Sequence, residues 1–371
     1  MPFAAALSEH PVAAHAVGEV VGQVLEAIGE GPDLACLFVT TPHTGAMEDI
    51  VPTVRSLLRP VALLGSTAVA VVGGRREVED HSAIALWAGR LPAPARPVRL
   101  SGSPEARLPD DGTLLLLADP FSFPVDTFVE WAAERHPRLQ VAGGLASAAR
   151  GPGGNRLVLD DRIHADGAVG VHLAADTPLT TVVSQGCRPV GPAFTITKAE
   201  GQLIHELAGR PALERLQAVV DAMTPDERLM ATKGLHIGRV INERALDFGP
   251  GDFLIRGVLG ADRAAGAIAI GDTAEIGDTV QFQVRDADSA DEDLRVLLAR
   301  QQPAAGALVF TCNGRGTHLF REPDHDADAI SDHVEGSGVA GMFCAGEVGP
   351  IGDRSFLHGF TASVVLFQDR R

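Results

Sequence analysis

The sequence predicts an α/β fold with α+β character, in which repeated strand-helix-strand-strand units form mixed sheets flanked by helices in two domains. A strand-helix-strand-strand pattern recurs three times along the 371 residues, and self-similarity of this kind reports architecture. The second strand of every copy ends in small residues. The short strands that follow cannot all be joined by helical crossovers, which favours mixed or antiparallel pairing over a doubly wound parallel sheet.

Each copy contains a first strand, a helix, a second strand and a further strand. The first strands begin at Leu34, Leu114 and Ala307, the helices cover about 49–58, 125–135 and 326–334, the second strands begin at Val61, Val141 and Val339, and the last strands begin at Ser82, Ala168 and Ala362. The second strands contain Gly65, Gly143 with Gly144, and Gly341. Glycine at such positions lets a turn or a ligand approach the backbone closely.

Other elements surround these copies. Residues 11–28 carry an apolar stripe typical of an amphipathic helix, and the proline-rich stretch 91–112 is a stiff connector between the first two copies. After residue 173 we expect two strands separated by a turn around Gly191 and Pro192, a helix after Pro211, three strands from Gly234, Asp252 and Thr279, and a helix opened by a capping box at 289–292.

Two domains follow from this order of elements. We place the boundary near residue 201, so that 1–201 forms a first domain with two related halves, about 1–90 and 113–175. Residues 202–371 form the second domain, which closes with the third copy.

Composition limits the function. The formal net charge is −17, from 31 basic and 48 acidic residues, and such a field repels phosphate backbones and anionic lipid, so we expect neither a nucleic-acid partner nor a membrane partner. The four cysteines, at 36, 187, 312 and 344, have no paired spacing. They indicate neither a disulfide framework nor a zinc site and suit a reducing compartment. With no signal-peptide pattern, we expect a cytoplasmic protein.

The common catalytic and cofactor motifs are absent from the sequence, which contains no P-loop, no G-x-G-x-x-G followed by a helix, no H-E-x-x-H and no G-x-S-x-G. We therefore expect no cofactor and no catalytic residue. The acidic run Asp324, Asp326 and Asp328 with His325 invites a metal hypothesis. Acidic residues also favour the first turn of a helix, and we prefer that interpretation.

Three lone residues carry weaker signals. Cys312 lies near Arg315, and Cys187 lies beside Arg188, so a guanidinium could lower either thiol pKa and create a nucleophile. Free cysteine is also among the most commonly buried residues, which is the simpler explanation. His358 could act as a base, although a lone histidine is more often a hydrogen-bonded structural residue.

Two loops of the third copy are hard to explain as scaffolding. One is 310–316, which holds Cys312, Asn313, Arg315 and Gly316, and the other is 346–350, which holds Glu347. Both leave neighbouring strands, and ligands of α/β sheets bind beyond strand ends. We therefore expect Arg315 and Glu347 to lie within reach of each other.

The chemistry of these two side chains suits a zwitterion such as an amino acid. A guanidinium fork matches a carboxylate, and a carboxylate matches an ammonium. A structural Arg–Glu pair that holds the two loops together is the alternative. Arg285 and Asp286, at a strand end, form a similar candidate with weaker support.

Seven segments resemble the FIST family, whose parts are the FIST N and FIST C domains. They are VAGGLAS from Val141, SQGCRPVGPAFTITKAEG from Ser184, ELAGRPALERL from Glu206, DFLIRGVLGAD from Asp252, VQFQVRDADSADEDL from Val280, VFTCNGRGTHLF from Val309 and GMFCAGEVGPIG from Gly341. The resemblance covers essentially residues 30–371. It implies a bacterial-type intracellular sensory module for small ligands such as amino acids. Family members are often joined to output domains; since this sequence carries none, we expect it to act through a separate signalling partner.

Three functions remain open. The leading hypothesis is a non-catalytic small-ligand receptor in signal transduction. The second is an enzyme, a hydrolase or transferase that uses Cys312 or Cys187. The third is a regulatory scaffold without a ligand, which would present a surface instead of a pocket. An exposed sheet edge would also permit a homodimer.

Overall fold

The structure is a computed structural model that describes residues 2–101, 108–244, 248–249 and 251–369. Contacts divide the chain into two compact units. Residues 1–183 and 294–371 form the first unit, and residues 184–293 form the second. The position near residue 201 falls between two strands of the second unit, and the expected domain limits remain a prediction.

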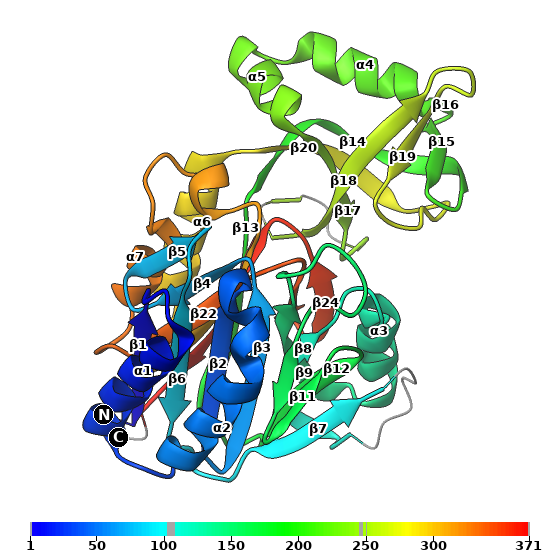
Figure 1. Ribbon diagram of the computed structural model, residues 1–371. Coiled ribbons are helices and arrows are strands. Elements are labelled where there is room, and N and C mark those ends of the chain that lie inside the picture. Colours follow the sequence, from blue (N-terminus) through cyan, green and yellow to red (C-terminus); the bar gives the residue numbers. More distant parts are fainter. Residues whose placement is uncertain (1, 102–107, 245–247, 250, 370–371) are drawn as a thin grey trace. The chain divides into compact units, whose positions relative to one another are not determined.

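The threefold repetition accounts for the first unit (Figure 1). In each copy the first strand pairs in parallel with the second and antiparallel with the last. The strands of the first copy are β2 (Leu34–Thr40), β3 (Ala62–Ala68) and β6 (Ile84–Gly89); those of the second are β8 (Asp111–Ala118), β9 (Arg138–Leu145) and β12 (Ala168–Leu173); those of the third are β21 (Gly306–Cys312), β22 (Val339–Cys344) and β25 (Thr361–Phe367). The predicted mixed sheets are therefore confirmed.

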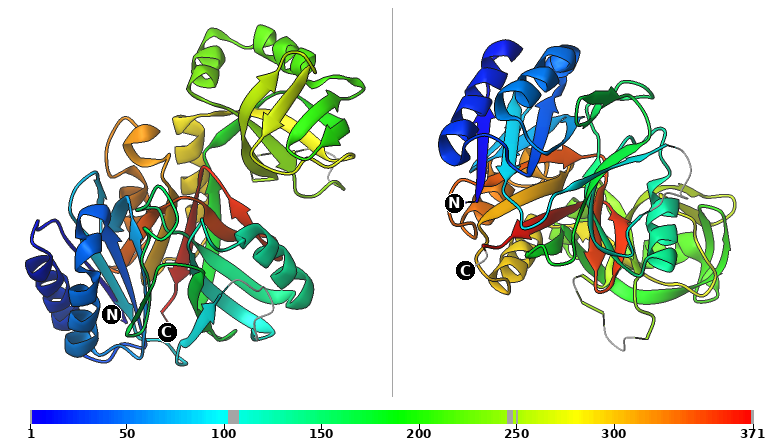
Figure 2. Two further views of the ribbon diagram at one scale, coloured as in Figure 1. Left: turned by 45° about the vertical axis from the view of Figure 1, so that its right-hand side comes forward. Right: turned by 90° about the horizontal axis from the view of Figure 1, so that it is seen from below.

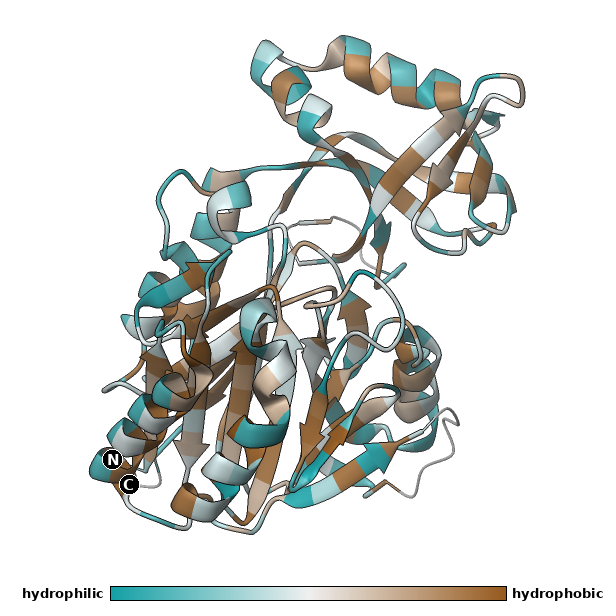
Figure 3. Ribbon diagram, viewed as in Figure 1, coloured by the Kyte–Doolittle hydropathy of each residue, from teal (hydrophilic) through white to brown (hydrophobic). Residues whose placement is uncertain are grey.

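The inner faces of the three sheets share one apolar core. It includes Phe38, Leu117 and Phe310, which stand at corresponding positions of the three first strands. Helices cover the outer faces: α1 (Ala13–Ile28) and α2 (Met47–Leu58) on the first sheet, α3 (Val125–Arg135) on the second, α7 (His325–Ser331) and the end of α6 (Ala287–Ala299) on the third. The strands are accordingly mostly brown in Figure 3, because both faces are buried.

Each copy also gives a β-hairpin to the sheet of another copy. Hairpin β4 (Ala70–Gly73) with β5 (Arg76–Glu79) pairs with β22; hairpin β10 (Leu157–Leu159) with β11 (Arg162–His164) pairs with β3; hairpin β23 (Glu347–Ile351) with β24 (Arg354–His358) pairs with β9. The exchange is cyclic, and in Figure 2 red strands of the third copy lie beside green strands of the second. Strands β1 (Phe3–Ser8), β7 (Arg96–Leu100) and β13 (Leu179–Gln185) complete the edges of the sheets.

A glycine stands at the same place in each second strand. Their partners in the first strands are Leu37 for Gly65, Leu116 for Gly143 and Val309 for Gly341. A Cβ at Gly341 would overlap the carbonyl oxygen of Val309. These glycines therefore let neighbouring strands approach, as their pattern in the sequence predicts.

Replacement of Gly341 by alanine is expected to destabilise the first unit by about 1–3 kcal/mol or more, because the added methyl group forces the two strands apart. Gly18→Ala in α1 is the matched control, since a Cβ there meets no atom within 4 Å in the described part of the chain. That change should stabilise the helix by about 0.5–1 kcal/mol. Urea denaturation measures both, and equal effects of the two substitutions would contradict the close-approach argument.

Two sequence expectations need correction. The proline-rich stretch is not only a connector, because β7 within it pairs with β12; its residues 102–107 lie outside the described residues. The predicted turn around Gly191 and Pro192 is wrong. Strand β14 (Cys187–Glu200) continues through this point with a register shift between Pro189 and Ala193. Proline lacks an N–H and interrupts the ladder there without reversing the chain.

The second unit is a sheet that closes on itself through pairing of β14 with β15. Its remaining strands are β15 (Leu203–Leu207), β16 (Arg210–Pro211), β17 (Leu235–Val240), β18 (Phe253–Asp262), β19 (Ala267–Ile270) and β20 (Thr279–Arg285), accompanied by α4 (Ala212–Ala222) and α5 (Pro225–Lys233). Among the described residues of the whole chain, no helix combines the length and apolar character needed to cross a bilayer.

Candidate functional site

The third copy departs from the other two at one buried position. Glu347 is the first residue of hairpin β23–β24, and it pairs with Gly144 on β9 of the second copy. The corresponding residues of the other two hairpins are Val71 and Leu157, and both belong to the central apolar core. An acid therefore replaces an aliphatic side chain in one of three otherwise similar environments.

Glu347 is fully buried. Its Oε2 accepts hydrogen bonds from the backbone N–H of Thr361 at 3.1 Å and from its hydroxyl at 2.8 Å. Burial raises the pKa of Glu347 to about 8, although the bonds from Thr361, the charge of Arg315 and the thiol of Cys312 act in the opposite direction. Oε1 accepts no hydrogen bond from any N–H or O–H of the described residues.

Arg315 is equally buried, in the loop that follows β21. Its Nε and Nη2 donate to the two oxygens of Asp326 at 2.7 and 2.8 Å, which is the bidentate geometry that a guanidinium favours. The hydroxyl of Thr311 donates to the same carboxylate at 2.9 Å, and the ring centroid of Phe320 lies 5.2 Å from Cζ. One edge of the guanidinium fork is thus occupied by Asp326, while Nη1 has no hydrogen-bond partner in the described part of the chain.

Asp326 stands in the first turn of α7, as the sequence predicts. Burial alone would raise the pKa of Asp326, but the charge and hydrogen bonds of Arg315 outweigh it and hold this pKa well below its usual range. Three or more side chains able to hold a metal ion together are not found within the described ranges.

A further acid, Glu77, lies near Asp326 and Arg315, and it belongs to hairpin β4–β5 of the first copy. The Oε1 atom of Glu77, on β5, accepts the backbone N–H of Ala327 at 2.9 Å. Burial, with the nearby charge of Asp326, raises the pKa of Glu77 to about 8. Its Oε2 has no hydrogen-bond partner among described residues. We call Glu77, Cys312, Arg315, Asp326, Glu347 and Thr361 the polar cluster.

The other predicted residues of the two loops lie beside this cluster. Cys312 is half-buried at the end of β21, and its Sγ accepts the N–H of Gly314 at 3.4 Å. The backbone N–H of Asn313 donates to the carbonyl of Cys344 at 2.9 Å. Gly316 has a φ of 55°, where glycine is favoured. His358 is the strand partner of Glu347, and its Nε2 donates to the carbonyl of Gly349 at 2.9 Å.

The candidates Arg188, Arg285 and Asp286 belong to the second compact unit. Arg188 pairs with Asp286 and with Glu227, each at 3.1 Å. Arg285 is the strand partner of Cys187, which is buried. These residues form an ion-pair group of their own.

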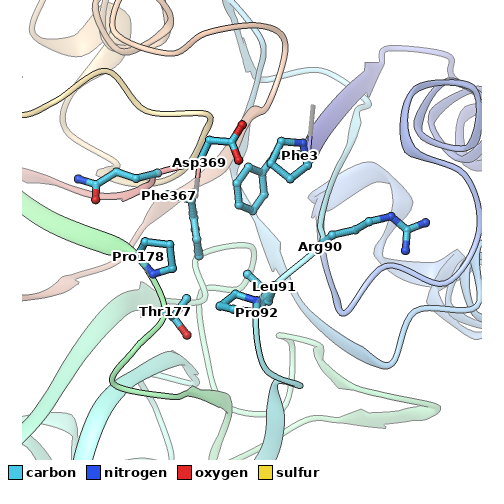
Figure 4. Close-up of a pocket in the computed structure, with 10 residues that line it drawn as sticks. Phe3, Arg90, Leu91, Pro92, Thr177, Pro178, Phe367 and Asp369 are labelled. Atoms are coloured by element: carbon cyan, nitrogen blue, oxygen red, sulfur yellow. The ribbon is translucent and has the colours of Figure 1, made fainter. Parts of the chain in front are cut away.

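A cavity of about 250 Å³ lies at the other end of β25 from Thr361. Figure 4 shows Phe3, Pro92 and Pro178 around Phe367, with Asp369 and Arg90 at the sides. The walls are mainly apolar, and none of the residues predicted to bind ligand lines this cavity.

Comparison with known proteins matches both halves of the chain. The model of the FIST N domain matches residues 33–210, and that of the FIST C domain matches residues 212–350. The chain is 43% identical over 374 residues to the uncharacterized protein Mb0898c of Mycobacterium bovis, with 97% of each chain covered. It is 42% identical over 385 residues to the uncharacterized protein Rv0628c of Mycobacterium tuberculosis, with both chains fully covered. FIST domains are associated with sensory signalling through ligand binding.

Proposed function

This chain belongs to the FIST family, and we propose that it is an intracellular sensory protein that binds an amino acid or a related zwitterion at the polar cluster. It has no catalytic role and acts through a separate signalling partner. The observation that carries the proposal is Glu347, a fully buried acid at a position that is Val71 and Leu157 in the other copies, whose Oε1 accepts no N–H or O–H from the part of the chain that the structure describes.

The cluster offers complementary groups to both ends of a zwitterion. Nη1 of Arg315 is available to a ligand carboxylate, and Oε1 of Glu347 with Oε2 of Glu77 is available to an ammonium. Each buried polar atom without a partner costs about 1–3 kcal/mol, so a ligand that pairs them recovers part of this free energy. Since Arg315 and Glu347 are fully buried, the loop 313–324 must open for a ligand to enter.

Binding should also move a proton. Because the pKa of Glu347 is raised to about 8, this carboxyl is mostly protonated at pH 7. An ammonium beside it favours the ionised form. Ligand binding at pH 7 is therefore expected to release a proton.

A thermal-shift screen of amino acids and related metabolites tests the proposal. A true ligand at a hundredfold excess over its Kd should stabilise the protein by about 2.7 kcal/mol. Glu347→Leu copies the residue type of Leu157 and should fold yet show no shift, whereas Glu322→Gln, at an exposed acid of the loop after β21, should respond as wild type does. The proposal fails if no compound of the screen shifts the transition, or if the leucine variant responds equally.

A thiol-dependent hydrolase or transferase is the second candidate. It is favoured by the contact of the half-buried Cys312 thiol with the Glu347 carboxylate and by the charge of Arg315 nearby. A guanidinium neighbour lowers a thiol pKa, and a carboxylate neighbour can take the thiol proton. Cys187 is a weaker choice because it is buried. Alkylation of Cys312 by iodoacetamide well below the usual thiol pKa would favour this candidate.

A further inference from the structure

Two cysteines stand side by side at the ends of neighbouring strands. Cys312 ends β21 and Cys344 ends β22, and the two are direct partners in the parallel register. Partners in adjacent strands are about 4.8 Å apart, within the Cα separation of about 4.4–6.8 Å that a disulfide requires. The bond from the N–H of Asn313 to the carbonyl of Cys344 holds the strand ends together just beyond this point.

The corresponding positions in the other two copies carry no such pair. They hold Thr40 with Ala68 in the first copy and Asp119 with Ala146 in the second. Thr40 exchanges hydrogen bonds with the backbone of Ala83 at 2.7 and 3.2 Å. In the third copy two sulfur atoms occupy the place where the other copies use a hydroxyl or a carboxylate beside alanine.

The surroundings of the two sulfur atoms differ. Cys312 is half-buried, while Cys344 is fully buried. The Sγ atom of Cys344 packs so closely against Gly144 that a Cβ on Gly144 would overlap it. Cys312 accepts the N–H of Gly314, and the Glu347 carboxylate lies next to it. In such an unequal pair the more accessible thiol, Cys312, reacts first, and the neighbouring buried thiol, Cys344, resolves the product.

We propose that Cys312 and Cys344 form a reversible disulfide within the chain on reaction with a hydroperoxide. In its ionised form Glu347 accepts the thiol proton of Cys312, whose sulfur attacks the terminal peroxide oxygen; the O–O bond breaks, and the alcohol, or water from hydrogen peroxide, leaves with that proton. Cys344 then attacks the sulfenic sulfur of Cys312, the S–O bond breaks, and the Cys344 proton leaves with the hydroxide as water. Two thiols supply the two electrons that reduce one peroxide.

The inference adds a redox response to the proposed receptor and does not depend on its ligand. The disulfide would remove the thiol that contacts Glu347, and so would change the polar cluster from within. Ligand binding can fail while the disulfide forms, and the reverse can also occur, so the two proposals are tested separately.

Peptide mapping without reductant tests the pair. The full chain is treated with hydrogen peroxide, alkylated and digested with trypsin, which releases Cys312 in peptide 301–315 and Cys344 in peptide 322–354. We expect these two peptides to appear joined, at their summed mass less two hydrogen atoms, and to separate on reduction. Cys36, a fully buried cysteine of β2, should remain a free thiol as the internal control.

Two variants that introduce the residues of the first copy separate the roles of the two thiols. Cys344→Ala copies Ala68 and should trap sulfenic acid on Cys312, detectable with dimedone, and Cys312→Thr copies Thr40 and should abolish oxidation of both positions. At pH 8.5, where the Glu347 carboxyl is mostly ionised, Glu347→Gln should slow formation of the joined peptides about 100-fold, the usual loss on removing a proton acceptor. Joined peptides that never form, that bridge two chains, or that form equally fast without the Glu347 carboxylate would overturn the proposal.

Discussion

Raising the pH from 6.5 to 8 is expected to lower the free energy of unfolding of the first unit by about 2–4 kcal/mol. The pKa of Glu77 and that of Glu347 are each about 8 in the folded protein, against 4.5 for an ordinary glutamate. The folded state therefore binds more protons than the unfolded state in this range. The stability that these two acids contribute is fully present below about pH 4.5 and is lost as the pH rises through 8. The loss is up to about 1.4 kcal/mol for each acid and each pH unit.

The window above pH 6.5 separates these acids from other titrations. His236 of the second unit is buried, and its pKa is lowered to about 4 from 6.5, so most of the change in its contribution to stability falls below about pH 7. Both tryptophans of the chain, Trp87 and Trp131, lie in the first unit. Urea denaturation followed by tryptophan fluorescence thus reports the relevant transition.

Glu347→Gln should remove about half of this pH dependence, since it keeps the shape of the side chain and abolishes its titration. Glu322→Gln, at an exposed position, should keep all of it. A wild-type stability that is constant or rises between pH 6.5 and 8 would contradict the assignment of buried, protonated acids.

Arg315→Ala and Asp326→Ala should each destabilise the first unit by about 3–5 kcal/mol. Either change leaves one charge buried without its partner, and the side chains of the pair are 0% and 1% exposed. The double variant Arg315→Met with Asp326→Leu should lose much less, because apolar side chains of similar volume often replace a buried pair at little cost. The same fluorescence measurement in urea gives all three values.

Arg75 provides the control for this pair. Its Nη2 lies 2.7 Å from Asp332, as close as Arg315 lies to Asp326, but its side chain is 57% exposed. Solvent screens such a pair, so Arg75→Ala should change stability little. If the Arg315 and Asp326 variants lose no more than Arg75→Ala does, burial is not what makes the pair matter.

The threefold repeat could be predicted because the sequence of each copy contains the same pattern of apolar strands and glycines. Leu34, Leu114 and Ala307 open strands that the structure confirms to within a few residues. The exchange of hairpins could not be predicted, since a short hairpin such as 70–79 can pair with any exposed strand edge. Glu77 was missed for this reason: its sequence neighbours belong to the first copy, and its contacts belong to the third.

Only part of the polar cluster was predictable from the sequence, namely the nearness of Cys312, Arg315 and Glu347, and the pairing of Arg315 was not. Strand ends placed Cys312, Arg315 and Glu347 in one region, and the structure brings them together. The partner of Arg315 was not foreseen, because the helix-start explanation of Asp326 is correct and already accounts for an acid there. Only the three-dimensional course of the loop 313–324 brings that acid to the guanidinium.

Titration calorimetry at pH 7 on the first zwitterion that passes the screen tests the central claim, that Glu347 makes the third copy a ligand site. In wild type we expect saturable binding, with an enthalpy that varies with the ionisation enthalpy of the buffer because Glu347 releases a proton. In Glu347→Leu we expect no binding by a folded protein. Binding of equal affinity in both proteins would contradict the claim, as would a wild-type enthalpy that is independent of the buffer.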